Sequence, residues 1–336
     1  MIPVLRPVLV AAAVVALVLA SDTSSSAGEK GAGESRAAQS VDYVALGDSY
    51  SAGPLITPQR RDPTGCFRSL NNYPSFLAGY LGVTTYRDVS CSGARVRDFA
   101  KRQTPALGAK VPPQLAALTA DTDLVTVGIG GNDFGLFGSL TSVCSDQATK
   151  HPHAKAPCKA FFTNKHGVNT KFRDARAIQQ HAAQGLQEIH AAAPNAAVVL
   201  VGYPRLLPDH GTCRGKAPFA KGDYPFANRV EHFLNKSLKQ AAAKHNATFV
   251  SMTAVSKGHD ICAGKKAAWI NGSTSTFGVA LAYHPFEAGE RAIARHVFWK
   301  LTGQAAPTNG DAQPPLGAIR CNPQPSLIPV LTPTCT

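Results

Sequence analysis

Four short polar segments contain the residues best suited to nucleophilic chemistry. They are 47–49 (Gly-Asp-Ser), 91–94 (Cys-Ser-Gly-Ala), 130–133 (Gly-Gly-Asn-Asp) and 283–289 (Tyr-His-Pro-Phe-Glu-Ala-Gly). A serine hydroxyl becomes a good nucleophile when a base lies within hydrogen-bond reach, and histidine is the usual base near neutral pH. Ser49 and His284 are therefore the candidate nucleophile and base.

The same segments contain donors for an oxyanion. Gly93 can present its backbone N–H without a side chain in the way, and Asn132 has a neutral amide donor. The N–H of Ser49 is expected at the start of a helix, where backbone donors are unpaired. Taken singly, each segment is also an ordinary turn, and His284 is one of eleven histidines. The chain has no Gly-x-Ser-x-Gly, which excludes the nucleophile elbow of α/β-hydrolases.

Short apolar runs alternate with helical patterns along the folded part of the chain. The predicted strands are 41–46, 86–89, 124–129, 197–201 and 248–252. The predicted helices are 73–81, 175–192, 229–245 and 285–301. This alternation indicates a parallel sheet with helices on both faces. Because chemistry in such folds gathers at the carboxyl ends of the strands, the polar segments that follow strands are expected to meet at one edge of the sheet.

Taken in order, the four segments resemble the SGNH (GDSL) hydrolase family, and the match covers nearly all of residues 41–303. Residues 66–74 (Cys-Phe-Arg-Ser-Leu-Asn-Asn-Tyr-Pro) and the further cysteines are similar to its secreted actinomycete (Streptomyces-type) lipase/esterase branch. The resemblance implies a three-layer α/β/α, flavodoxin-like fold around a central five-stranded parallel sheet. It implies Ser49 as nucleophile, His284 as general base and then acid, and an oxyanion hole formed by Ser49, Gly93 and Asn132. No metal and no cofactor are expected.

One position departs from the family pattern. Members usually have an aspartate three residues before the histidine, where it orients the imidazole, and this chain has Leu281 there. A leucine side chain cannot accept a hydrogen bond. We expect a backbone carbonyl, that of Leu281 or Ala282, to take this role, and Asp260 is the alternative as the nearest acidic residue upstream.

The N-terminus predicts export. Arg6 precedes an apolar run over residues 8–20, which is short for a bilayer span and is typical of a signal peptide. An uncleaved membrane anchor is the alternative. The expected organisation is a signal peptide at 1–27, a flexible leader at 28–40, the hydrolase domain at 41–303 and a Pro-rich tail at 304–336. The protein is expected to be secreted and extracellular.

The cysteines predict disulfides in an exported chain. There are eight of them and no Cys-x-x-Cys spacing, which disfavours a zinc site. Sequential pairing is the simplest of many connectivities and is a preference, not a derivation. It would give the pairs Cys66–Cys91, Cys144–Cys158, Cys213–Cys262 and Cys321–Cys335.

Composition and charge restrict the partners. With 44% hydrophobic and 16% charged residues, the chain is not a disordered polyelectrolyte. The formal net charge of +13 lies on the folded domain, because four basic and four acidic residues outside 41–303 cancel. A basic cluster within 150–173 could attract an anionic lipid surface or an acidic glycan, or be only a solvated loop. Predicted export and the lack of a recognition motif disfavour nucleic acid as a partner, and a monomer is expected.

The leading expectation is a secreted lipase or esterase that cleaves acyl lipids, with phospholipase A activity as an extension. A polysaccharide acetyl esterase is the alternative enzyme, and Leu281 raises a third hypothesis, a non-catalytic lipid-binding or cell-wall-binding module. Six apolar residues near the polar segments are expected either to line an acyl groove or to belong to the core: Leu55, Ile56, Phe134, Leu136, Phe137 and Leu140.

Overall fold

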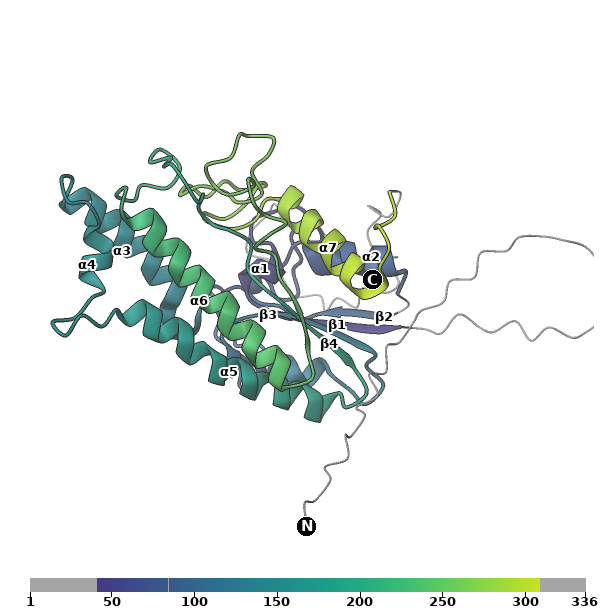
Figure 1. Cartoon of the computed structure of the whole chain (residues 1–336). Coiled ribbons are helices and arrows are strands. Elements are labelled where there is room, and N and C mark those ends of the chain that lie inside the picture. Colours follow the sequence, from purple (N-terminus) through teal and green to yellow (C-terminus); the bar gives the residue numbers. More distant parts are fainter. Residues whose placement is uncertain (1–40, 84, 309–336) are drawn as a thin grey trace, which may run out of the picture.

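A five-stranded parallel sheet lies between two layers of helices in the computed structural model, which describes residues 41–83 and 85–308 (Figure 1). The strands are β1 (Asp42–Gly47), β2 (Thr85–Asp88), β3 (Leu124–Gly128), β4 (Ala197–Val201) and β5 (Thr248–Val250). They are arranged in the order β2-β1-β3-β4-β5, and every neighbouring pair is parallel. The expected α/β fold with a five-stranded parallel sheet is confirmed. The strand order changes direction between β1 and β3, which is where such sheets form ligand crevices.

The described residues also form seven α-helices and four short 3₁₀ turns, which lie between these strands or, for the last helix, after them. The helices are α1 (Ser49–Ala52), α2 (Tyr73–Leu81), α3 (Leu136–Lys150), α4 (Pro157–Phe161), α5 (Thr170–Ala192), α6 (Asp223–Lys244) and α7 (Glu287–Thr302). The 3₁₀ turns are η1 (Thr64–Cys66), η2 (Val96–Phe99), η3 (Gln114–Ala117) and η4 (Asp133–Gly135). Helix α2 matches its prediction. Helix α5 begins earlier than predicted because Asn169 caps it, its side chain accepting hydrogen bonds from the N–H groups of Lys171 and Phe172.

The two faces of the sheet bury separate cores. Val44 and Leu46 of β1 point into a core shared with α5 and α6, whereas Tyr43 and Ala45 point into a core shared with α2 and α7. In Figure 1, α5 and α6 accordingly cover one face of the sheet, and α2 and α7 cover the other. The central strands β1, β3 and β4, which are buried on both faces, read as nearly continuous apolar runs, and this explains why they were recognisable in the sequence.

The segment between residues 134 and 173 differs from the sequence prediction. No helix was predicted for it, and it contains most of η4, all of α3 and α4 and the start of α5. Lys171, assigned to the basic cluster, is buried and forms an ion pair of 2.9 Å with Asp174. Lys150 pairs with Asp146 at 2.9 Å on an exposed part of α3. The basic cluster at 150–173 is therefore not simply a solvated loop, because part of it is helical and one of its lysines is buried, although its remaining lysines are exposed.

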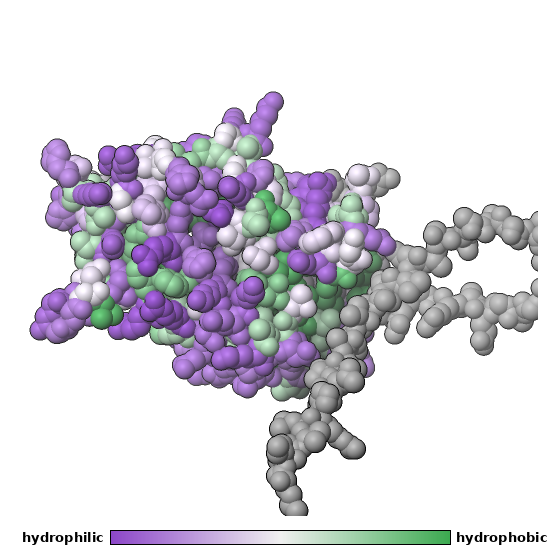
Figure 2. All heavy atoms as spheres, viewed as in Figure 1, coloured by the Kyte–Doolittle hydropathy of each residue, from purple (hydrophilic) through white to green (hydrophobic). Residues whose placement is uncertain are grey.

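The described residues form three disulfides: Cys144–Cys158, which joins α3 to α4, and Cys66–Cys91 and Cys213–Cys262, which join segments outside the long helices and the sheet. The fourth expected pair, Cys321–Cys335, lies outside the described residues, as do the proposed signal peptide, the leader and most of the tail. Within residues 41–83 and 85–308, no helix is long and apolar enough to cross a membrane. On the face drawn in Figure 2, hydrophilic residues are interspersed with hydrophobic ones.

Candidate active site

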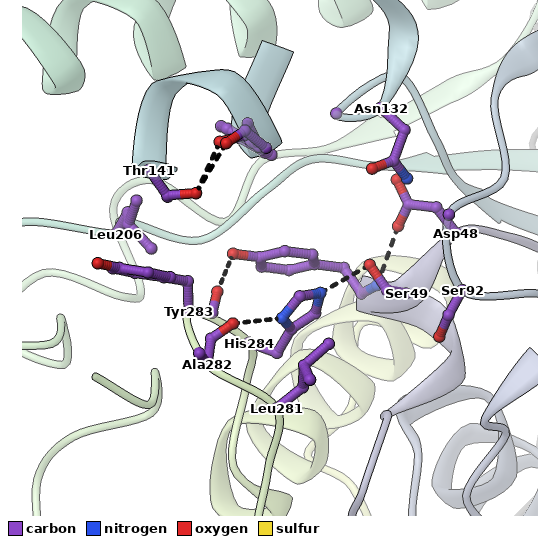
Figure 3. A pocket seen from close by; sticks show the side chains of 15 residues that line it. Asp48, Ser49, Ser92, Asn132, Thr141, Leu206, Leu281, Ala282, Tyr283 and His284 are labelled. Atoms are coloured by element: carbon purple, nitrogen blue, oxygen red, sulfur yellow. Dashed lines mark hydrogen bonds between the residues drawn. The ribbon is translucent and has the colours of Figure 1, made fainter. Parts of the chain in front are cut away.

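The four polar segments line one pocket of about 240 Å³. Ser49 follows β1, Gly93 follows β2, Asn132 follows β3, and His284 comes from the loop before α7. The sheet therefore collects at its carboxyl edge residues that lie far apart in the chain. Figure 3 shows His284 between the Ala282 carbonyl and the Ser49 hydroxyl.

Ser49 is positioned by a sharp turn between β1 and α1. Asp48 caps α1 by accepting a hydrogen bond of 2.9 Å from the Tyr50 N–H. Gly47 has φ +151°, and a Cβ there would lie 2.3 Å from Ser51 Oγ and 2.7 Å from the Gly128 carbonyl oxygen. Only glycine therefore allows the chain to leave β1 on this path.

His284 lies between a hydroxyl and a carbonyl. Its Nε2 is 2.7 Å from Ser49 Oγ, and its Nδ1 is 2.7 Å from the carbonyl oxygen of Ala282. Since a carbonyl can only accept, the proton of the neutral ring belongs on Nδ1, and Nε2 is left to accept the hydrogen bond from Ser49. The Leu281 carbonyl has other donors, the backbone N–H of His284 and the side-chain amide of Asn271. Of the two carbonyls expected, the one at Ala282 contacts the imidazole.

Asp260 makes different contacts. Its carboxylate accepts a hydrogen bond of 2.8 Å from the N–H of Cys262, and its carbonyl accepts one from Ala263. No hydrogen bond or ion pair joins it to His284 in the described part of the chain. The geometry is that of a serine–histidine dyad oriented by a backbone carbonyl.

The loop that carries His284 is held by an aromatic side chain. Tyr50 donates a hydrogen bond of 2.6 Å to the Tyr283 carbonyl, and the Tyr50 ring lies 5.1 Å from the imidazole. Tyr283 has φ +62°, a left-handed conformation that costs a non-glycine residue about 1 kcal/mol or more. The Tyr50 contact thus helps to fix a strained loop beside the base.

Burial changes the basicity of His284. Desolvation by the surrounding residues lowers the pKa of His284 from 6.5 to about 4, and the hydrogen bond to the Ala282 carbonyl acts in the opposite direction. The ring is therefore neutral, as a base must be, throughout the physiological range of pH.

Three residues with available donors, Ser49, Gly93 and Asn132, line the same pocket. In the part of the chain that the structure describes, the backbone N–H groups of Ser49 and Gly93 have no hydrogen-bond partner. The Asn132 amide donates one hydrogen bond of 3.0 Å to the Ala94 carbonyl, which orients the side chain and leaves its second N–H for a ligand. The arrangement can hold a developing negative charge on an oxygen bonded to the carbon that Ser49 attacks.

The two aspartates of these segments hold loops together. Asp48 accepts a hydrogen bond from the Tyr203 hydroxyl, which in turn accepts one of 2.7 Å from the Gly131 N–H. Burial raises the pKa of Asp48 to about 7. Asp133 accepts hydrogen bonds from the N–H of Val96 at 3.1 Å and from His181 at 2.9 Å. These contacts connect the ends of β1, β3 and β4 and so fix the donors relative to Ser49.

Three supporting residues were not singled out from the sequence. Tyr203 lies in the Gly-Tyr-Pro that follows a predicted strand, so its place at the carboxyl edge was recognisable although its contact with Asp48 was not. For Tyr50, the only feature of the sequence that pointed to the site was its position next to Ser49. Gln114 gave none, and yet its side-chain amide hydrogen-bonds both the N–H and the carbonyl of Gly47, at 2.8 and 2.9 Å.

Some of the six apolar residues that were expected to line an acyl groove or to belong to the core do the first, and others do the second. Ile56, Leu136 and Leu140 are at most 1% exposed and belong to the interior. Phe137 lines the active-site pocket, and Leu55 lines a neighbouring cavity. Phe134 is 47% exposed and stacks on His181. Within the described ranges, no group of three or more His, Cys, Asp or Glu side chains is arranged to hold a metal ion.

Comparison with known proteins gives consistent matches. The model of the GDSL-like Lipase/Acylhydrolase family matches residues 45–292. "Lipase 2" of Streptomyces coelicolor is 38% identical over 272 residues, which cover 79% of this chain and 87% of that protein. Two solved structures, a phospholipase A1 from Streptomyces albidoflavus and an extracellular lipase from Streptomyces rimosus, are each 28% identical with a TM-score of 0.62. Each of these matches covers 77% of this chain and 98% of the other.

Proposed function

The chain belongs to the GDSL-like lipase/acylhydrolase family and is a carboxylic ester hydrolase, and we propose that it cleaves acyl lipids through an acyl-enzyme on Ser49. The observation that carries this mechanism is the hydrogen bond of 2.7 Å between His284 Nε2 and Ser49 Oγ. It supports the proposal because a base in hydrogen-bond contact with a serine hydroxyl can take its proton as soon as a substrate binds.

In the first half of the reaction, Ser49 Oγ attacks the ester carbonyl carbon while its proton passes to His284 Nε2. The carbonyl oxygen becomes an oxyanion that accepts hydrogen bonds from the N–H groups of Ser49 and Gly93 and from the Asn132 amide. His284 then returns the proton to the alkoxide as it leaves, and the acyl group remains on Ser49.

The second half repeats this chemistry with water. His284 removes a proton from water, the hydroxide attacks the acyl-enzyme, and the proton returns to Ser49 Oγ as the carboxylic acid departs. During both halves the hydrogen-bond acceptor at Nδ1 of the imidazolium, among the described residues, is the Ala282 carbonyl at 2.7 Å. Such a dyad keeps the correct tautomer but supplies less compensating charge than an aspartate would.

The substrate class follows from the walls of the pocket. Tyr50, Phe137, Leu206 and Tyr283 offer it apolar or aromatic surface, which suits an acyl chain. We expect p-nitrophenyl esters from acetate to decanoate all to be hydrolysed, with kcat/KM higher for butyrate and longer chains than for acetate. Activity confined to acetate would contradict the lipase proposal and favour an acetyl esterase. Failure of an organophosphonate to label Ser49 would favour the non-catalytic binding module.

Asn132 offers a test of the oxyanion hole. Asn132→Ala removes one of three donors, and we expect kcat on p-nitrophenyl butyrate to fall about 10²- to 10³-fold with little change in KM. Asn164→Ala, on the exposed turn between α4 and α5, is the control and should leave kcat unchanged. A loss for Asn132→Ala smaller than about threefold would remove Asn132 from the oxyanion hole.

We also propose that the enzyme is secreted, with residues 1–27 as signal peptide, 28–40 as leader and 304–336 as tail around a hydrolase domain at 41–303. The apolar run after Arg6 supports this proposal. One chain supplies every residue placed in the mechanism, which is consistent with a monomer.

A further inference from the structure

A second cavity adjoins the active site. It has a volume of about 500 Å³ and shares Ser92, Gly93 and Leu281 with the pocket around Ser49. Gly93 is one of the proposed oxyanion donors, so a substrate bound at Ser49 lies next to this cavity. The mechanism described above leaves the cavity without a role.

Three arginines line this cavity, Arg95 and Arg97 at η2 and Arg102 just after it. All three are exposed. The guanidinium of Arg95 has no hydrogen-bond or ion-pair partner among the described residues, and that of Arg102 donates to the Lys110 carbonyl at 2.9 Å. Arg97 lies 3.6 Å from Asp98, whose carboxylate also accepts a hydrogen bond of 2.8 Å from the Arg95 backbone. With three cations and one carboxylate, the lining has an excess of positive charge.

The wall between the two cavities also contains polar side-chain atoms without a hydrogen-bond partner among the described residues. Gln103 donates a hydrogen bond of 2.9 Å to the Ser92 carbonyl, which fixes the side chain. The Ser92 hydroxyl and the side-chain oxygen of Gln103 have no partner in the described part of the chain. A guanidinium fork with a nearby hydroxyl is the donor set that proteins use for phosphate.

The arginine-lined cavity lies on one side of the catalytic pair and the apolar wall on the other. In Figure 3, Ser92 lies on the far side of Ser49 from Leu206 and Tyr283. An ester held at Ser49 with its acyl chain against Phe137 and Leu206 therefore directs its alcohol portion toward Arg95, Arg97 and Arg102.

We propose that this cavity is a subsite for a phosphate group on the alcohol portion of the substrate, as in the head group of a phospholipid. The proposal rests on the proposed function, because it needs an ester bound at Ser49. An Arg–phosphate pair adds both charge and bidentate geometry, so phosphate-bearing esters gain binding that neutral esters lack. The subsite makes head-group charge a determinant of specificity, independently of any attraction to a membrane surface.

The test compares water-soluble esters with identical acyl chains, kept below the concentration at which they aggregate. The substrates are dihexanoyl phosphatidic acid and dihexanoylglycerol, and the quantity is the ratio of their kcat/KM values. Hydrogen bonds to charged groups contribute substantially, although exposure weakens them, so in R95Q/R97Q/R102Q we expect this ratio to fall roughly 30-fold or more. A matched variant with the same loss of charge, K165Q/K236Q/K239Q on exposed positions away from both cavities, should keep the wild-type ratio and activity.

Three outcomes would overturn the subsite. The first is an unchanged ratio in the arginine variant while the neutral ester is still hydrolysed. The second is an equal fall in the lysine control, which would reduce the effect to overall charge. The third is that the wild type shows no preference for the phosphate ester, while inorganic phosphate alters dihexanoylglycerol hydrolysis in the wild type and not in the arginine variant. The cavity would then bind the free ion and not the substrate. Failure of the proposed function itself would look different, because neither ester would then be hydrolysed through Ser49.

Discussion

Ser49→Ala is expected to lower kcat on p-nitrophenyl butyrate by about 10⁶-fold, the scale seen when a serine hydrolase loses its nucleophile. The reason is local, since Ser49 Oγ is the atom that accepts the acyl group and its hydrogen bond of 2.7 Å joins it to the base. Binding is expected to persist, because the three oxyanion donors and the apolar wall remain. The measurement is the initial rate with purified protein, together with mass spectrometry after treatment with an organophosphonate.

The control for this variant is Ser142→Ala on α3, an exposed serine whose hydroxyl bonds only to backbone carbonyls of its own helix. It should retain wild-type kcat and wild-type labelling of Ser49. Residual activity of Ser49→Ala above about one hundredth of wild type, in a preparation free of contaminating esterase, would assign the nucleophile to another residue.

His284→Asn is expected to lower kcat by about 10⁵- to 10⁶-fold, because no other base lies within hydrogen-bond reach of Ser49 Oγ in the described residues. Since the two residues act as one unit, the double variant with Ser49→Ala should be no slower than either single variant. His166→Asn in an exposed turn is the control. Additive losses in the double variant would contradict the dyad. A loss of several orders of magnitude in a folded Asp260→Asn variant would show that a carboxylate orients the imidazole.

The same base should set the pH dependence of the wild type. Burial lowers the pKa of His284 to about 4, and only its neutral form can take the proton from Ser49, so kcat/KM should stay level as the pH falls from 8 to 6 and decline only near pH 4. The unfolded chain binds this proton more readily, so His284 contributes stability that is lost as the pH falls from 6.5 toward 4. Burial raises the pKa of Asp48 to about 7, so Asp48 contributes with the opposite sign, adding stability as the pH falls from 7 toward 4. Circular dichroism at each pH separates unfolding from loss of catalysis. If kcat/KM of the folded protein declined with a midpoint near pH 6.5, the lowered pKa of His284 would be contradicted.

The strands and their polar ends were predictable because both have strong local signals. The central strands β1, β3 and β4 are buried on two faces and are therefore mostly apolar, and the turn after β1 needs glycine and a capping side chain. Gly47 and Asp48 meet both demands, so the place of Ser49 follows from local chemistry. The proximity of Gly93, Asn132 and His284 to it follows from the parallel topology.

Other parts of the molecule depend on contacts that local sequence does not encode. Helix α3 contains Gly138 and several serines and threonines, which have weak helix propensity, and so its pattern did not predict a helix. Packing of Leu136 and Leu140 and the disulfide Cys144–Cys158 accompany the helix in the structure. Gln114 meets Gly47 across 67 residues of sequence, and nothing in its own surroundings marks it as a support for the nucleophile turn.

The acceptor that orients His284 is a main-chain atom, and this has a genetic consequence. A triad aspartate can be lost by a single codon change, whereas every substitution at position 282 still encodes a carbonyl. Mutations can damage this arrangement only by altering the path of the loop, for example through the left-handed Tyr283 or through Tyr50, which holds it. The acceptor that orients His284 therefore depends on several residues that fix the conformation of the loop, and not on the identity of the side chain at one position.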